Sequence, residues 1–125
     1  MKKKDKEITH MFNQVLVTVL NKIELLDKLL DEFEEAGVSG ATVISSIGMA
    51  HALAGREESH FISSFRAFFD VSHSESKTIF IVCSDEMAEK AKEAVRKIVG
   101  DLNEPDSAIM FSVPLLYIEG ISHSE

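Results

Sequence analysis

Residues 77–100 read KTIFIVCSDEMAEKAKEAVRKIVG, and this stretch decides the fold. Its first part, Lys77–Cys83, is rich in β-branched and aromatic residues and predicts a strand. Ser84 or Asp85 can cap the helix that follows, and Gly100 can end it. One apolar stripe runs along that helix at helical spacing, formed by Met87, Ala91, Ala94, Val95 and Ile98. The stretch therefore predicts a strand followed by an amphipathic helix.

The same order occurs earlier in the chain. Residues 15–20 read VLVTVL and are apolar on both faces, which favours a central strand covered on both sides. A helical pattern follows, with acidic residues on its other face and Gly37 where a left-handed residue would end it. The apolar positions are Leu26, Leu29, Leu30 and Phe33. The chain thus contains two predicted strand–helix units.

Each unit is followed by a further predicted strand. Residues 41–47 form the second strand, closed by Gly48, and residues 108–113 form the fourth. After Pro114, the apolar run 115–118 predicts an edge strand or a strand extension. The order predicts an α+β fold, a ferredoxin-like βαββαβ sandwich with a long loop after the second strand and a C-terminal extra strand. We expect a flexible, solvated tail over residues 1–10 and a single domain over 11–125, with the long loop at 48–76.

In such a fold both helices cover one face of an antiparallel sheet. The strands are apolar on both faces, yet the sequence contains no third long helix to cover the other face. Self-association through the sheet faces is the simplest way to cover it. We therefore expect an oligomer.

The formal net charge is −8, from 13 Lys and Arg against 21 Asp and Glu. A protein that binds nucleic acid without sequence preference needs clustered Lys and Arg, so this class is excluded. A nucleotide-sized ligand needs only a few local cations and is not excluded. With 45% apolar residues, the composition is that of a globular domain.

We expect the protein to be cytoplasmic and not inserted in a membrane. The lone Cys83 cannot form an internal disulfide, which fits a reducing compartment. No apolar stretch approaches the ~20 residues of a membrane span. Charged and polar residues interrupt the N-terminal region, so it does not predict a secretory signal.

The long loop contains a phenylalanine cluster at helical spacing, made up of Phe61, Phe65, Phe68 and Phe69. One interpretation is a short helix packed on this protein's own sheet or on a neighbouring subunit. The other is a helix that docks into a groove of a partner protein. Arg66 lies in the same segment and could reach an anionic ligand or partner.

The sequence offers no catalytic motif, and we expect a protein that is not an enzyme. Cys83 lies in a predicted central strand and is expected to be a buried, inert thiol. The loop histidines His51, His60 and His73 match no compact metal-ligand pattern, so no metal site is predicted within one chain. One histidine per subunit could still form a metal site on a threefold axis.

The stretch from Gly37 to Val43 reads GVSGATV and is followed at a short distance by Gly48. It resembles the GxxGxTV-to-glycine stretch of the nitrogen-regulatory PII signalling proteins. The segments 15–19 with Lys22, 80–85 and 109–115 are similar to other strands of that family. The resemblance covers residues 14–121.

The resemblance implies a ferredoxin-like homotrimer that senses a small effector in clefts between subunits, with an adenine nucleotide as the candidate. It implies that the 48–76 loop docks on an unknown target protein, which could be an enzyme, a transporter or a regulator. The candidate partner-binding residues are Phe61, Phe65, Arg66, Phe68 and Phe69. The candidate effector contacts at the loop base are Thr42, Ile47, Gly48, Met49 and Ala50, with Gly100, Asp101 and Asp106 across the cleft. Arg56, Arg66 or Lys77 would supply positive charge if the effector is anionic.

The chain departs from the family pattern where phosphate would bind. The family has a glycine-x-glycine at the loop base, where this chain has Gly48-Met49-Ala50. The family's paired arginines after the last proline are absent, and Gly120 and Ser122 lie near those positions. Residues 100–108 read GDLNEPDSA, with no Lys and three acids that repel phosphate. No cofactor is therefore assigned with certainty, and ATP binding of the usual kind is in doubt.

Three alternatives remain open. The chain could be a trimeric interaction scaffold that binds no ligand. It could be a metal-binding relative of the divalent-metal tolerance proteins, which would require the loop histidines to converge. Amino-acid-binding regulatory domains share the strand order, but Asn21-Lys22-Ile23 replaces their glycine at the start of the first helix.

Overall fold

The computed structural model describes residues 12–54 and 76–121. The predicted tail and residues 55–75, including the phenylalanine cluster, lie outside the described residues. The elements in chain order are β1 (Gln14–Leu20), the 3-10 helix η1 (Ile23–Leu25), α2 (Leu26–Glu35), β2 (Thr42–Ser46), α3 (Met49–Ala54), β3 (Ser76–Cys83), α5 (Asp85–Val99) and β4 (Ala108–Pro114).

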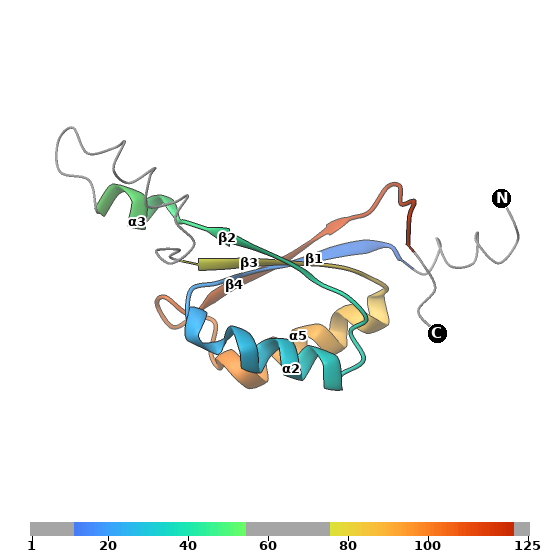
Figure 1. Ribbon diagram of the computed structural model, residues 1–125, viewed down its shortest axis with the longest axis horizontal. Helices are drawn as coiled ribbons and strands as arrows, with labels where there is room; N and C mark the ends of the chain where they lie inside the picture. The colour runs from blue at the N-terminus through green and yellow to red at the C-terminus, as the bar shows by residue number, and fades with distance from the viewer. Residues whose placement is uncertain (1–11, 55–75, 122–125) are drawn as a thin grey trace, which may run out of the picture.

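The four strands form one antiparallel sheet in the order β2-β3-β1-β4. Both α2 and α5 lie against the same face of this sheet (Figure 1). Val17 of β1 lies opposite Phe80 of β3 and Phe111 of β4, which fixes the register at the centre. The predicted ferredoxin-like fold is confirmed.

The core lies between the sheet and the two helices. The sheet contributes buried residues at alternate positions, because successive strand side chains point to opposite faces. From β1 these are Leu16 and Leu20, and from β3 Ile79, Ile81 and Cys83. The helices contribute Leu29, Phe33, Ala88, Ala91, Ala94, Val95 and Val99. Small alanines on α5 leave room for that helix to approach the strands closely.

The boundaries of the two long helices lie where the sequence predicts them. The side chain of Ser84 accepts a hydrogen bond of 3.1 Å from the backbone N–H of Met87, which caps α5. Gly100, at φ 91°, follows its last turn. At the end of α2, Gly37 has φ 89°, and Val38 N–H donates to the Phe33 carbonyl at 2.9 Å. This is the Schellman pattern that glycine allows.

Two features differ from the sequence prediction. The helix α3 lies at Met49–Ala54, where only a loop was expected. Its sequence, MAHALA, consists mainly of strong helix formers, but six residues are too short to show a helical period.

The extra strand predicted at 115–118 is not formed within the chain. The neighbour of β4 is β1, whose first residue Gln14 already lies opposite Pro114. The backbone N–H of Leu115 still donates to the Asn13 carbonyl at 2.9 Å. Residues beyond Leu115 therefore have no strand of their own sheet to pair with among the described residues.

Candidate functional site

The base of the long loop lies where β2 ends and β3 begins. Ser46 Oγ lies 2.7 Å from Ser76 Oγ and 2.8 Å from Thr78 Oγ1, so a small hydroxyl network links the two strands. On the other face, Lys77 Nζ donates to Ser45 Oγ at 2.9 Å. These contacts fix the two points at which the loop leaves the sheet and returns to it. The predicted site did not include this network, because which hydroxyl residues face each other depends on how β2 pairs with β3.

The predicted contacts at the loop base follow directly on β2. Ile47 is half-buried, whereas Gly48 and Met49 are exposed. The Gly48 carbonyl accepts from Ala52 N–H at 3.0 Å and so opens α3. A methyl group added at Gly48 would meet nothing within 4 Å, so this glycine faces open space. The backbone of Ala50 lies in α3, on the loop side of Gly48.

Thr42 lies at the opposite end of β2 from these residues. It is exposed and lies opposite Phe80, whereas Ser46, at the loop end, lies opposite Ser76. Four residues of extended chain separate Thr42 from Ser46, about 13 Å. An effector that touches both Gly48 and Thr42 of the same chain would have to span about this length of β2.

The second half of the predicted site is the turn between α5 and β4. Asp101 Oδ1 accepts from Asn103 N–H at 2.9 Å, and Asp106 has a positive φ of 57°. Ser107 is buried and donates to the carbonyls of Leu102 at 3.1 Å and Glu104 at 2.8 Å. The turn is thus held by its own hydrogen bonds. Its acidic side chains, Asp101, Glu104 and Asp106, all point to the exposed surface.

The turn is also fixed to the end of β1. The Ser107 carbonyl accepts hydrogen bonds from Asn21 N–H at 3.0 Å and Lys22 N–H at 3.3 Å. Because Ala108 lies opposite Leu20, and Leu20 opposite Lys77, the turn lies at the same end of the sheet as the loop base. Figure 1 shows the α5–β4 turn and the start of α3 at this end.

The two halves nevertheless lie on opposite edges of the sheet. The loop base follows the edge strand β2, and the turn precedes the edge strand β4, with β3 and β1 between them. Three strand spacings separate the two edges, about 14 Å. One chain therefore does not bring Gly48 and Asp101 together around a small molecule.

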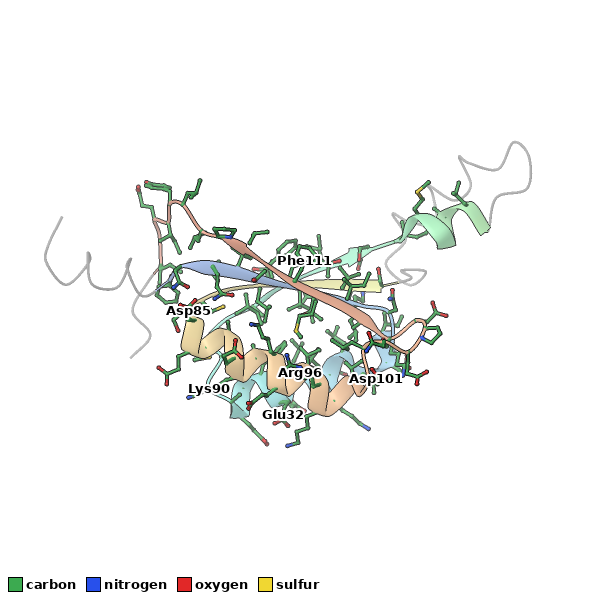
Figure 2. All side chains as sticks on the ribbon, turned by 180° about the vertical axis from the view of Figure 1, so that it is seen from behind. Glu32, Asp85, Lys90, Arg96, Asp101 and Phe111 are labelled. Atoms are coloured by element: carbon green, nitrogen blue, oxygen red, sulfur yellow. The ribbon has the colours of Figure 1, made fainter. Side chains whose placement is uncertain are left out.

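The sheet face opposite the helices, called the open face below, is mostly apolar; its polar positions in the described strands are Thr42, Ser46, Ser76 and Thr78. It carries Val15, Val17, Val19, Ile44, Phe80, Val82, Ile109, Phe111 and Val113, placed there by strand alternation and by the cross-strand register. No Asp, Glu, Lys or Arg of the four described strands falls at an open-face position in this register. The apolar residues of the two edge strands are the most uncovered, with Ile44 of β2 47% exposed, and Ile109 59%, Phe111 48% and Val113 42% exposed on β4. Figure 2 shows Phe111 on the side of the sheet away from the helices.

The sequence predicted this bare face but not that its edge strands, β2 and β4, would be its most exposed parts. The reason is positional: β1 and β3 are central strands, and their open-face residues are shielded by neighbours on both sides. Val17, for example, is only 6% exposed although no helix covers it. The edge strand β4 lacks a neighbour on one side, so its apolar side chains stay uncovered.

A shallow groove of about 300 Å³ lies between α2 and α5, on the side of the helices away from the sheet. It is lined by Glu32, Ala36, Lys90, Glu93, Ala94 and Lys97. Lys97 Nζ and Glu32 Oε2 form an ion pair across it at 3.1 Å. Figure 2 shows Glu32 and Lys90 on this helical side, so the groove is not part of the predicted effector site.

The thiol of Cys83 is free and buried in the core. Burial raises the pKa of this thiol above its ordinary value. A raised pKa keeps the thiol protonated and weakly nucleophilic at neutral pH. The prediction that Cys83 is buried is confirmed.

Several predicted residues cannot be placed relative to the site. Arg56, Phe61, Phe65, Arg66, Phe68 and Phe69 lie outside the described residues, as do His60 and His73. Within residues 12–54 and 76–121, no group of three or more His, Cys, Asp or Glu could hold a metal ion. In the same parts of the chain, no helix is long and apolar enough to cross a membrane.

No family model and no curated protein match the chain. Solved structures match its fold. A functionally unknown protein from Pediococcus pentosaceus is 16% identical with a TM-score of 0.57, over 89% of this chain and 99% of that one. A protein from Thermus thermophilus, provisionally assigned as PII-like signalling, is 12% identical with a TM-score of 0.54, over 84% of this chain and 87% of that one. At these identities the likeness concerns the fold.

Proposed function

We propose that this chain is a PII-like signalling protein that acts in the cytoplasm without catalysing a reaction. In this proposal it forms a homotrimer, binds a small effector in clefts between subunits and regulates a partner protein through residues 48–76. The sequence resemblance at 37–48 and the fold shared with the Thermus thermophilus protein support the proposal.

One observation gives this proposal its main support. The loop base and the α5–β4 turn lie at the same end of the sheet but on opposite edges. They can enclose a small effector only if the loop base of one copy faces the turn of another. The uncharged open face supplies the surface through which copies would associate.

The charge of the turn limits the effector. Asp101, Glu104 and Asp106 are exposed, and residues 100–107 contain no Lys or Arg. Phosphate groups placed at this turn would be repelled. Among the described residues, Lys77 places a cation at the loop base, where its ammonium group donates to Ser45. The family resemblance makes an adenine nucleotide the first effector to test, and the acidic turn predicts weaker binding for its more highly charged forms.

Calorimetry tests this proposal. Wild-type protein is titrated with AMP, ADP, ATP, cyclic dinucleotides and small organic acids, and at least one is expected to bind once per subunit.

The double variant Asp101→Asn/Asp106→Asn should bind an anionic effector more tightly, because two repelling charges are removed. The variant Phe111→Asp, designed to be monomeric, should lose binding because each site needs two copies. Equal affinity in that monomer would contradict a cleft between subunits.

A ligand-free interaction scaffold is the second candidate, and the acidic turn is the observation that favours it. An intact trimer that gives no calorimetric heat of binding with any of these ligands would support the scaffold.

In either case Phe65→Ala is expected to weaken partner binding without dissociating the trimer. Loss of the folded trimer in that variant would instead place Phe65 in the core. Metal analysis of the purified protein tests the metal-binding alternative.

A further inference from the structure

The groove between α2 and α5 owes its space to small side chains. Ala36 of α2 and Ala94 of α5 both line it, and Ala94 is 3% exposed whereas Ala36 is half-buried. Because a methyl group fills little space, the two alanines leave a hollow of about 300 Å³ between the helices. This volume is that of the smallest ligand sites, so the groove suits a molecule of amino-acid size.

An ion pair between the helices fixes one part of the groove. Lys97 Nζ lies 3.1 Å from Glu32 Oε2, and the Glu32 side chain is only 19% exposed. Figure 2 shows Glu32 on the same side of the molecule as Lys90, away from the sheet. These two charges, Glu32 and Lys97, therefore satisfy each other without a ligand.

The other two charges of the groove are not satisfied in this way. Lys90 and Glu93 line it, and neither has a hydrogen bond or an ion pair among the described residues. They are three residues apart on α5, the spacing at which Glu89 and Lys92 of the same helix do pair, at 2.7 Å. The hollow is thus bordered by one cation and one anion that are not bound to each other.

The balance of charge selects the class of ligand. The charged lining consists of two carboxylates and two ammonium groups, so its formal charge is zero. An anion such as a phosphate would meet both carboxylates, and a cation would meet both ammonium groups. A molecule that carries both charges can satisfy Lys90 and Glu93 at once. An α-amino acid carries its carboxylate and its ammonium group on one carbon and fits between side chains about 5–6 Å apart at their Cβ atoms.

The end of α2 favours the same ligand. This helix has no basic residue in its last turn, and its C-cap residue, Ala36, lines the groove. The C-terminal end of a helix carries a partial negative charge that attracts a cation. An ammonium group placed in the groove would therefore be attracted by the end of α2 as well as by the Glu93 carboxylate.

We propose that the groove between α2 and α5 binds a free α-amino acid with an uncharged side chain. The Lys90 ammonium group donates to the carboxylate of the ligand, and the ammonium group of the ligand donates to the Glu93 carboxylate. The ligand side chain rests on Ala36 and Ala94. Because ion pairs between exposed groups contribute little, we expect a dissociation constant of about 1 mM. The site lies within one chain and does not depend on the proposed cleft between subunits.

A titration followed by the backbone amide signals in NMR tests the ligand class. L-leucine should shift the amide signals of Ala36, Glu93 and Ala94 in the wild-type protein. N-acetyl-L-leucine lacks the ammonium group and L-leucinamide lacks the carboxylate, so each should bind at least about fivefold more weakly. Equal binding of all three compounds, or no shift with L-leucine at millimolar concentration, would overturn the proposal.

Variants of α5 test the two charges. Lys90→Gln and Glu93→Gln should each weaken L-leucine binding about fivefold. Lys92→Gln and Glu89→Gln are the matched controls, because they make the same changes of charge on the same helix but do not line the groove. Both controls should bind L-leucine as the wild type does. Unchanged affinity in both Lys90→Gln and Glu93→Gln would contradict the proposed contacts.

The variant Phe111→Asp separates this site from the effector cleft. A site within one chain should bind L-leucine with the same affinity in the folded monomer, whereas an effector held between subunits should be lost. Loss of L-leucine binding in the folded monomer would overturn the groove as the site and would place the amino acid between subunits. Retained L-leucine binding alongside a trimer that binds no effector would support the groove and count against the effector cleft alone.

Discussion

The two faces of the sheet carry equally apolar residues but differ in what covers them. On the helix-covered face, Leu16, Leu20 and Ile79 are at most 1% exposed. On the open face, residues of the same strands alternate with these, and Ile109 of the neighbouring β4 is 59% exposed. The propensity of these residues for β structure cannot explain the difference in exposure between the two faces, because each strand contributes side chains to both faces. The covered face therefore stabilises the folded chain, whereas the open face is available for association.

The largest expected difference between the faces is in folding stability. Leu16→Ala should lower the free energy of unfolding by about 3 kcal/mol, because it leaves a cavity beneath α2 and α5. Val113→Ala on the open face should lower it by less than about 1 kcal/mol. Both are measured by urea denaturation in the Phe111→Asp background, so that association does not contribute. Equal losses would mean that the two faces do not differ as described.

The next effect concerns association. Phe111→Asp places a carboxylate in the middle of the open face and should raise the trimer dissociation constant by roughly 100-fold or more, because an unpaired charge would be buried. Sedimentation equilibrium measures it. Lys90→Asp, on the exposed side of α5, is the matched control and should leave association unchanged. If both variants remain trimeric, the open face is not the interface.

A smaller effect tests the covered face at a polar position. Thr18 is completely buried, and its Oγ1 has no hydrogen-bond partner among the described residues. Thr18→Val keeps the side-chain shape and removes the unsatisfied hydroxyl. It should raise the free energy of unfolding by about 1 kcal/mol, as measured by urea denaturation. A loss of stability would show that the hydroxyl does find a partner.

The smallest effect is the pH dependence contributed by Cys83. Burial raises the pKa of its thiol in the folded state, so the unfolded chain releases this proton first as pH rises. The stabilising contribution is complete below the ordinary thiol pKa and is lost above it. Unfolding free energy should therefore fall as pH rises through and above the ordinary thiol pKa. Comparison with Cys83→Ala isolates the effect, since that variant should show a flatter profile.

Much of the fold can be predicted from the sequence, because the sequence patterns that specify its strands and helices are local. Strand alternation, the helix stripes, the Ser84 cap and the glycines at 37 and 100 all lie where the sequence predicts. The short α3 was missed because six residues show no period. The extra strand at 115–118 was predicted from composition alone, and composition cannot reveal whether an edge is available to pair with.

The candidate site was less predictable, because it depends on which strands become edges. The family resemblance implied that Gly48 and Asp101 face each other across a cleft between subunits, and the sheet order β2-β3-β1-β4 puts them on opposite edges of one chain. The uncovered residues Ile109 and Phe111 owe their exposure to the edge position of β4, which no local pattern in their own strand encodes. The hydroxyl network at Ser46 likewise arises from pairing between strands 30 residues apart in sequence.

The central claim is that the uncharged open face joins copies of this chain into the assembly that completes the effector site. Sedimentation equilibrium of the wild-type protein at micromolar concentration tests it most directly. The account predicts a single species of three times the 13.9 kDa chain mass. A stable species of 13.9 kDa under the same conditions would contradict it.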